Sequence, residues 1–292
     1  MDFDKEEIIR RYKEKLGIDI SDFLGLPNQF IRVNTLKADV DKVIKVLEER
    51  GYQFEKLSYL DFGFKVLNND KIITKEVEHA VGYIFSQDAS SMLVPLALEL
   101  SEKDVVLDLC AAPGAKTTEI AQLMNNNGVI VANDVRFDRI KALASNIQRM
   151  GVLNTIITLE DGRFLYKKLQ NYFDKVLVDA PCSATGTFKP DALIAVNEKF
   201  IKSLQKLQKS LLRSAYFLTK KDGIIVYSTC SLEIEENEEV VKWFLENFNV
   251  EIEEIKIKGI KLIDALDNEI RKAKRVLIKG QEAFFISKFR KV

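Results

Sequence analysis

Residues 105–118 read VVLDLCAAPGAKTT, and this stretch decides the fold. Its first five residues are apolar except for Asp108, a pattern typical of a buried parallel strand. Small residues then form a tight turn, and a helix is expected to begin at Lys116. The small side chains let a ligand lie against the backbone, while the helix start offers free N–H groups and the positive end of its dipole. The stretch therefore predicts a binding turn for a small, partly charged ligand.

Two nucleotide-binding motifs are disfavoured at this turn. A P-loop requires glycine at positions 110 and 115, where this chain has Cys110 and Ala115. The dinucleotide fingerprint G-x-G-x-x-G is also absent. Residues 129–133 predict the next strand, and Asp134 follows it twenty positions after Gly114, where a carboxylate can bind both hydroxyls of a ribose. The alternative, that Asp134 only caps the next helix, is the weaker account beside this turn.

The composition is that of a soluble globular protein of one or two domains, with 292 residues, 47% hydrophobic and 30% charged. The formal net charge is zero, so any nucleic-acid surface must be a local patch. No apolar run approaches the roughly 20 residues of a membrane span, and the first residues are charged. We therefore expect a cytoplasmic protein without membrane association.

Cysteine and histidine usage argues against several chemistries. The three cysteines are too few and too widely spaced for a disulfide framework, and no C-x-x-C pair suggests zinc, so no metal site is predicted. His79 is the only histidine and lies in no catalytic context, which disfavours Ser-His-Asp and Cys-His hydrolases. We interpret His79 as structural or exposed.

The first part of the chain predicts a small α+β domain over residues 1–80, either RRM-like or ferredoxin-like. Its expected elements are a helix at 5–16, a strand at 30–34, a helix at 40–50, and strands near 54 and 64–67. Residues 71–87 are interpreted as a linker. Arg32 and Lys37 flank the first strand, and such a sheet can present a face to RNA, although basic residues beside a strand are more often solvated surface.

Residues 81–292 predict a second, larger domain in which strands and helices alternate. Strands are expected at 105–109, 129–133, 155–159, 175–178 and 223–227, and helices at 88–100, 116–124, 138–150, 198–220 and 235–248. Late strands near 250–257 and at 283–289 depart from the alternation. The predicted fold is α/β, with a Rossmann-like, mostly parallel sheet that has an antiparallel edge strand.

Sulfur and carboxylate groups follow the ends of these strands. They are Cys110, Asp134, Asp161, the Asp179 and Cys182 of DAPC, and Cys230 of STCS. Because ligands bind outside the carboxyl ends of such strands, we expect these groups around one pocket. A thiol there can serve as a nucleophile. Methylation of cytosine at carbon 5 needs one, since a thiolate must first add to carbon 6 while a group such as Asp179 hydrogen-bonds ring nitrogen 3.

A structural role is the alternative for each cysteine, since free cysteine is commonly a small buried hydrophobe. We favour that role for Cys110 more than for Cys182 or Cys230. The residues alone do not decide which of Cys182 and Cys230 is the nucleophile.

The motifs RVNTLK, QDASSMLVPLAL, DLCAAPGAKTT, DAPCSATGT and STCSLEIEENEEVV, with the final FFISKFRK, resemble the RNA 5-methylcytosine methyltransferases of the Nol/Nop/Sun type. The likeness covers almost the whole chain and is closest to the compact archaeal tRNA-modifying members. It implies an enzyme with a methyltransferase domain, S-adenosylmethionine as cofactor, and an RNA substrate, with tRNA favoured over rRNA. A monomer is expected.

The resemblance also assigns roles to matching positions. It implies that Cys230 is the nucleophile, that Cys182 assists product release, and that Asp179 faces both methyl donor and cytosine. Asp134 would hold the ribose, and Asp161 the adenine. The remaining cofactor-binding positions are Cys110, Ala111, Ala112, Pro113, Gly114, Ala115, Lys116 and Arg139.

Two further interpretations concern the surface. The acidic run EIEENEEVV after STCS is expected to be a solvated helix face with Val240, Val241 and Phe244 packing inward. The loop after DAPC has few basic residues, so RNA affinity is expected to come from Arg32, Lys37, Lys189, Arg10 and Arg11.

Two alternatives to an RNA cytosine-5 methyltransferase remain open. One is a scaffold that binds RNA or S-adenosylmethionine without catalysis, and the other is an enzyme that methylates a nitrogen or a protein side chain. Neither would need the set Asp179, Cys182 and Cys230.

Overall fold

The larger of two sheets contains the parallel strands expected from the sequence. Its strands are β5 (Val105–Asp108), β6 (Val129–Asp134), β7 (Thr155–Leu159), β8 (Phe173–Asp179), β9 (Thr219–Thr229), β10 (Val250–Glu253), β11 (Ile263–Asp264), β12 (Lys274–Val276) and β13 (Phe284–Lys291). The computed structural model describes residues 5–24, 28–68 and 71–292. Within these ranges the strand order is β11-β12-β13-β9-β8-β5-β6-β7, and β10 pairs with β13.

The five strands from β9 to β7 are parallel, and β13 runs antiparallel to β9. The predicted Rossmann-like sheet with an antiparallel side is therefore confirmed. β5 lies between β6 and β8, so the strand order reverses at β5. The carboxyl ends of strands at such a reversal form the crevice in which open α/β sheets bind ligands.

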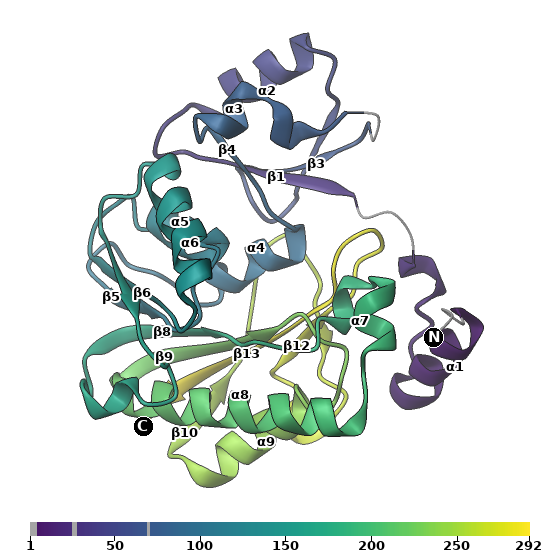
Figure 1. The fold of residues 1–292 in the computed structure, drawn as a ribbon, viewed down its shortest axis with the longest axis vertical. Helices are drawn as coiled ribbons and strands as arrows, with labels where there is room; N and C mark the ends of the chain where they lie inside the picture. The colour runs from purple at the N-terminus through teal and green to yellow at the C-terminus, as the bar shows by residue number, and fades with distance from the viewer. Residues whose placement is uncertain (1–4, 25–27, 69–70) are drawn as a thin grey trace.

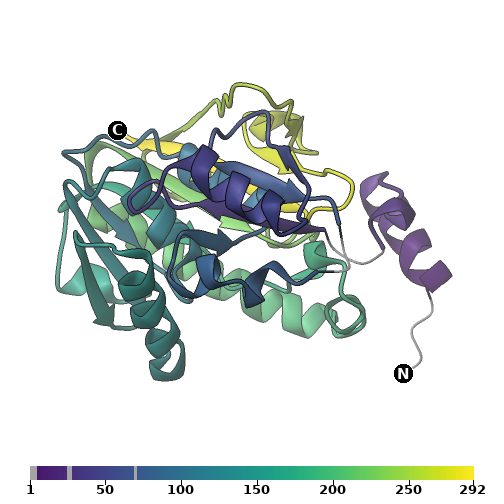
Figure 2. The same cartoon turned by 90° about the horizontal axis from the view of Figure 1, so that it is seen from above.

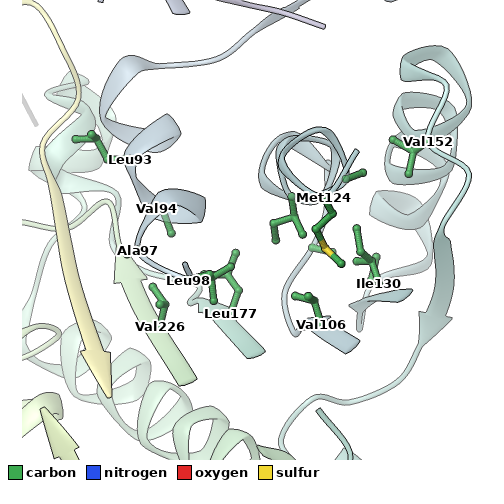
Figure 3. Close-up of a cluster of buried hydrophobic side chains, with 14 of the residues drawn as sticks. Leu93, Val94, Ala97, Leu98, Val106, Met124, Ile130, Val152, Leu177 and Val226 are labelled. Carbon is green, nitrogen blue, oxygen red and sulfur yellow. The ribbon is translucent and has the colours of Figure 1, made fainter. Parts of the chain in front are cut away.

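Helices cover both faces of this sheet (Figure 1). They are α4 (Ala89–Leu96), α5 (Ala115–Leu123) and α6 (Phe137–Met150) on one face, and α8 (Glu198–Leu218) and α9 (Glu238–Asn247) on the other, with the short α7 (Pro190–Ile194) before α8. Figure 3 shows Leu98, just after α4, beside Leu177 of β8 and near Val226 of β9. Apolar layers on both faces are what a buried parallel sheet requires.

The smaller sheet consists of β1 (Gln29–Val33), β2 (Phe54–Lys56), β3 (Gly63–Val66) and β4 (Ile84–Ser86), in the antiparallel order β2-β3-β1-β4. Two helices accompany it, α2 (Val40–Glu49) and α3 (Val77–Ala80). Figures 1 and 2 show this unit lying over α4 and the large sheet. β4 lies inside the stretch 71–87 that was interpreted as a linker, so that interpretation is wrong, and the small sheet continues past residue 80.

Helices pack against both faces of the small sheet at its inner strand β1. Because side chains alternate along a strand, Ile31 and Val33 of β1 point to α2, where they pack with Val43 and Leu47. Phe30 lies on the opposite face and packs with Met92 of α4. The sheet is thus covered by helices on both sides.

Helix α1 (Lys5–Leu16) is present with the predicted bounds but does not pack on the small sheet. Its apolar residues Ile8 and Tyr12 cluster with Leu193 of α7 and with Leu232 in the loop after β9. Figures 1 and 2 show α1 beside α7, away from the small sheet. The first residues described therefore support the large unit.

Other element boundaries differ modestly from expectation. The strand predicted at 155–159 is β7 with the same bounds, whereas the helix predicted at 88–100 ends at Leu96, and the one predicted at 235–248 begins only at Glu238. The short strands β11 and β12 were not predicted. In residues 5–24, 28–68 and 71–292, no helix is both long and apolar enough to cross a membrane.

Arg32 is enclosed where the two units meet. It is fully buried, and its guanidinium donates to Gln87 at 3.1 Å, to Thr118 Oγ1 at 2.7 Å and to Gln122. Thr118 and Gln122 belong to α5, the helix that follows the predicted binding turn. The expectation that Arg32 contacts RNA is therefore wrong, because its charged group has no access to a ligand.

Asn34 adds a second contact between the units. Its side-chain amide donates to the carbonyl oxygens of Gly82 and Met150, both at 2.8 Å. Gly82 has φ +78°, and a Cβ there would lie 2.0 Å from the carbonyl oxygen of Arg149. The turn before β4 thus approaches the end of α6 so closely that only glycine fits.

Glu119 gives this junction a pH dependence. Burial raises the pKa of Glu119 from 4.5 to about 8, although the Arg32 charge and the Gln87 hydrogen bond oppose that shift. Between these two values the folded protein keeps a proton that the unfolded chain has released, so stability falls as pH rises through this window. We expect the free energy of unfolding, measured by urea denaturation, to fall between about pH 5 and pH 9 in the unchanged protein. The fall should be smaller in Glu119→Gln. Equal losses in both proteins would contradict this assignment.

Candidate active site

The binding turn is built by the junction of β5 and α5. Gly114 caps α5 without a side-chain hydrogen bond and has φ +104°. A Cβ at this position would lie 3.0 Å from Leu143 Cδ1, so α6 packs against the turn. Asp108, the polar exception in β5, accepts a hydrogen bond from Thr117 Oγ1 at 2.7 Å and so fixes the helix start. The predicted strand, turn and helix are thus all present.

Asn133 and Asp134 connect the neighbouring strand ends. The Asn133 amide donates to the carbonyl oxygens of Leu109 and Glu160 at 3.1 and 3.0 Å. Asp134 accepts from Ala112 N at 3.2 Å and forms an ion pair with Arg139 at 3.3 Å. These contacts bring the ends of β5, β6 and β7 to one edge.

A cavity of about 280 Å³ opens at this edge. Four of the predicted cofactor-binding residues line it: Cys110, Asp134, Arg139 and Asp161. The other lining residues were not predicted as cofactor contacts; they are Leu109, Asn133, Val135, Gly162, Arg163, Pro181, Leu207 and Leu211. Leu207 and Leu211 come from α8, and their helical spacing alone does not show that they face a cavity rather than the core.

The donor set of the cavity fits a nucleoside. Asp134 offers carboxylate oxygens for ribose hydroxyls. Asp161 lies farther along the same edge, in an ion pair with Arg163 at 2.6 Å. Leucines from the end of β5 and from α8 provide an apolar wall for a base. Ala111, Ala112, Pro113, Gly114, Ala115 and Lys116 form the adjacent turn and helix start and do not line this cavity.

The two cysteines of the DAPC and STCS motifs meet at the next strand ends. Cys182 Sγ and Cys230 Sγ are 3.0 Å apart, although the residues are 48 positions apart in the chain. Their thiols are free, as is that of Cys110. The predicted groups thus lie at one sheet edge, but Asp179, Cys182 and Cys230 do not line the cavity that Cys110, Asp134 and Asp161 line, so the expected single pocket is not what the structure shows.

Asp179, at the end of β8, is held from two sides. Its Oδ2 accepts from Lys116 Nζ at 2.7 Å, and its Oδ1 accepts from Ser228 Oγ at 2.7 Å. Lys116 therefore lies on Asp179 rather than in the cavity wall, a role for which the sequence offered no signal. Burial favours neutral Lys116, but the charge and hydrogen bond of Asp179 outweigh it and raise the Lys116 pKa above its usual value. Lys116 is thus a buried cation beside the cysteines.

Cys230 is protonated near neutral pH. The hydrogen bond to Cys182, burial, and the nearby carboxylates Asp179 and Glu282 raise the pKa of Cys230 well above its usual value. Because the thiolate is the nucleophilic form, the proton must leave before or while the sulfur forms a bond.

The acidic run after STCS is not a solvated face, and that interpretation is wrong for three of its members. Glu233, Glu236 and Glu238 are buried, each with partners. Glu233 accepts from Tyr12 Oη at 2.6 Å and from Lys15 Nζ at 2.7 Å, which anchors α1. Glu238 forms an ion pair with buried Arg275 at 2.6 Å. The predicted inward packing of Val240, Val241 and Phe244 is confirmed.

The fold and this site define a Rossmann-like methyltransferase with a paired-cysteine centre. Residues 95–290 match the family described as "16S rRNA methyltransferase RsmB/F", and residues 27–75 match the "NOL1/NOP2/Sun domain family member 5, ferredoxin-like domain". The chain is 38% identical to the tRNA (cytosine(49)-C(5))-methyltransferase of Pyrococcus abyssi, with 89% of this chain and 87% of that protein covered.

Two further relatives extend this likeness. The ribosomal RNA small subunit methyltransferase F of Shewanella amazonensis is 37% identical, with 94% of this chain but 60% of that protein covered. The structure of NSun6 from Pyrococcus horikoshii with SFG, an S-adenosylmethionine analogue, superimposes with a TM-score of 0.88 at 25% identity, covering 99% of this chain and 98% of that one. The chain belongs to the RNA (cytosine-5) methyltransferase family, whose members depend on S-adenosylmethionine.

Proposed function

We propose that this enzyme methylates carbon 5 of a cytosine in tRNA, with Cys230 as the nucleophile. The observation that carries the proposal is the 3.0 Å separation of Cys182 Sγ and Cys230 Sγ at the strand edge that also holds Asp179. A methyltransferase acting on a nitrogen, or a scaffold without catalysis, needs no such thiol pair.

We assign each reacting group a role from its position. The Cys230 sulfur bonds to carbon 6 of the cytosine as its proton passes to the Asp179 carboxylate, while the displaced electron pair moves toward ring nitrogen 3. Asp179, hydrogen-bonded to the Lys116 ammonium at 2.7 Å, holds a proton at that nitrogen as charge develops there. S-adenosylmethionine supplies the methyl group as an electrophile. The carbon 5 proton is then lost to solvent water, the nitrogen 3 proton returns through Asp179 to the departing Cys230 sulfur, and the ring is restored; Cys182 assists this release.

The proposed cofactor contacts follow the lining of the cavity. Asp134 would bind the ribose hydroxyls, and Asp161 the adenine, with Cys110 and Arg139 beside them. The turn from Ala111 to Ala115 would lie beside the cofactor, and Lys116 holds Asp179. The target base must be unstacked, because carbon 6 is out of reach within a paired helix.

The preference for tRNA rests on coverage of the relatives. The match covers 87% of the length of the archaeal tRNA enzyme but 60% of that of the rRNA enzyme, so the likeness extends over more of the tRNA enzyme. Within the RNA patch proposed from the sequence, Lys189 and Arg10 are exposed, and Lys37 donates to the backbone carbonyl oxygens of Val81 and Arg149. The monomeric state and the cytoplasmic location stay predictions.

The substrate can be identified by offering the purified enzyme and S-adenosylmethionine either tRNA transcripts or 16S rRNA. We expect 5-methylcytosine, detected by nucleoside mass spectrometry, in tRNA and not in 16S rRNA. Product in 16S rRNA alone would overturn the tRNA assignment, and a methyl group on another atom would overturn the reaction. A Cys230→Ala control reports any contaminating methyltransferase.

A further inference from the structure

Glu236 is a buried carboxylate that joins three segments around the active site. It has an exposed fraction of 0%. Its Oε2 accepts from Ser183 N at 3.0 Å and from Gln208 Nε2 at 2.8 Å, and its Oε1 accepts from Ser231 Oγ at 2.7 Å. Its backbone carbonyl oxygen accepts from Tyr227 Oη at 2.6 Å. Both the main chain and the side chain of Glu236 are thus fixed.

The groups bound by this carboxylate adjoin the two cysteines. Ser183 directly follows Cys182, and Ser231 directly follows Cys230. The two loops also meet through the serine hydroxyls, which are 2.9 Å apart. Gln208 of α8 additionally donates to the Pro181 carbonyl oxygen at 3.0 Å, so it supports the DAPC loop from its other side.

We propose that Glu236 is a positioning residue that sets the separation of the Cys182 and Cys230 sulfurs. The effect of this separation on catalysis rests on the proposed function. The separation itself does not, because the two sulfurs hold it without RNA. Each loop is irregular beyond its strand end, and one carboxylate that accepts from both loops makes their positions depend on each other. Without it, the Ser183 N–H and the Gln208 amide lose a buried acceptor, and the loops must shift to find another.

Glu236→Gln is an informative substitution, because glutamine has the size of glutamate but replaces one of its two acceptor oxygens with an NH₂ donor. Its NH₂ group would face either the two donors on the Oε2 side or the Ser231 hydroxyl. In the first arrangement the NH₂ group faces the Ser183 N–H and the Gln208 amide, so donors face donors and no hydrogen bond forms. The second requires the Ser231 hydroxyl to turn its proton elsewhere and accept instead. Either arrangement weakens the hold on at least one loop.

A first experiment measures the separation without any substrate. Phenylarsine oxide binds two close thiols by exchanging its oxygen for two arsenic–sulfur bonds, with release of one water, and so needs no oxidant. We expect Glu236→Gln to bind it at least tenfold more weakly than the unchanged protein, because a loosened pair must be ordered on binding. Glu239→Gln, which removes an exposed carboxylate from α9, should bind it like the unchanged protein.

Three additional variants keep this experiment interpretable. Cys182→Ser and Cys230→Ser should each abolish two-point binding, which shows that the probe reports this pair and not Cys110. Ser231→Ala removes the Oε1 partner together with the hydroxyl contact to Ser183, should also weaken binding, and covers the case in which Glu236→Gln folds poorly. Unchanged affinity in both Glu236→Gln and Ser231→Ala would overturn the proposal.

A second experiment measures the catalytic consequence on tRNA. We expect Glu236→Gln to lower kcat at least tenfold while KM for RNA stays within about twofold, since the changed geometry affects reacting groups and not RNA binding. A purely structural role would instead lower the amount of folded enzyme and leave kcat per folded molecule unchanged, which would contradict the proposal. If the unchanged enzyme is inactive but the arsenical result holds, the proposed function fails and the positioning role stands.

Discussion

Cys230→Ala is expected to lower the methylation rate by at least about 10³-fold, the order of loss that follows removal of a covalent nucleophile. The sulfur at this position is the group proposed to add to carbon 6, and alanine offers no atom that can do so. The measurement is transfer of labelled methyl groups to tRNA, together with a search for an SDS-resistant protein–RNA adduct. No adduct is expected from Cys230→Ala.

Cys182→Ala is the matched variant, because its sulfur lies 3.0 Å from that of Cys230. It should form the covalent bond but release product slowly, so the adduct should accumulate above the level in the unchanged enzyme. The reverse pattern, an adduct in Cys230→Ala only, would exchange the two roles. Methylation with no adduct in either variant would exclude thiol addition as the mechanism.

Arg32→Leu is expected to lower the free energy of unfolding by about 3–5 kcal/mol, the typical effect of removing one partner from a buried charged network. The side chain is fully buried between the units and donates to Gln87, Thr118 and Gln122. Leucine leaves those acceptors unpaired and removes the cation that acts most strongly on buried Glu119. Urea denaturation at neutral pH measures the change.

Lys42→Ala provides the control for Arg32→Leu, because Lys42 is exposed on α2 and should change stability by less than about 0.5 kcal/mol. Adding Glu119→Leu to Arg32→Leu should recover part of the loss, since the buried carboxyl group, which must take up a proton on folding at neutral pH, is then gone. A loss below about 1 kcal/mol in Arg32→Leu would show that the junction tolerates the missing cation.

Local sequence patterns determined the architecture of the large domain. The apolar strand and small-residue turn of residues 105–118 predicted the parallel fold. The alternation of strands and helices along the chain then placed Asp179, Cys182 and Cys230 at the carboxyl-end edge of the sheet. These features could be predicted because hydrophobic periodicity and turn composition act over a few residues. Because ligands bind at the carboxyl ends of the strands in parallel sheets, residues at those ends are predicted to share one site.

The small sheet was less predictable. β4 was missed because three residues, Ile84–Ser86, carry too little pattern to distinguish a strand from a linker. The strand exists because it pairs with β1, a contact between segments some fifty residues apart. Only the assembled sheet supplies that partner.

The fate of charged residues was decided by the tertiary structure alone. Arg32 was expected on the surface and Glu236 on a solvated helix, yet both are fully buried. Lys116 was expected in the cofactor wall and instead binds Asp179. A charged side chain is normally exposed, and it can be buried only where the fold supplies compensating partners. Those partners come from distant parts of the chain. Local sequence patterns therefore determined the strands and the sheet edge that carries the reacting groups. Long-range contacts decided which charged side chains are buried near that edge and what they bind.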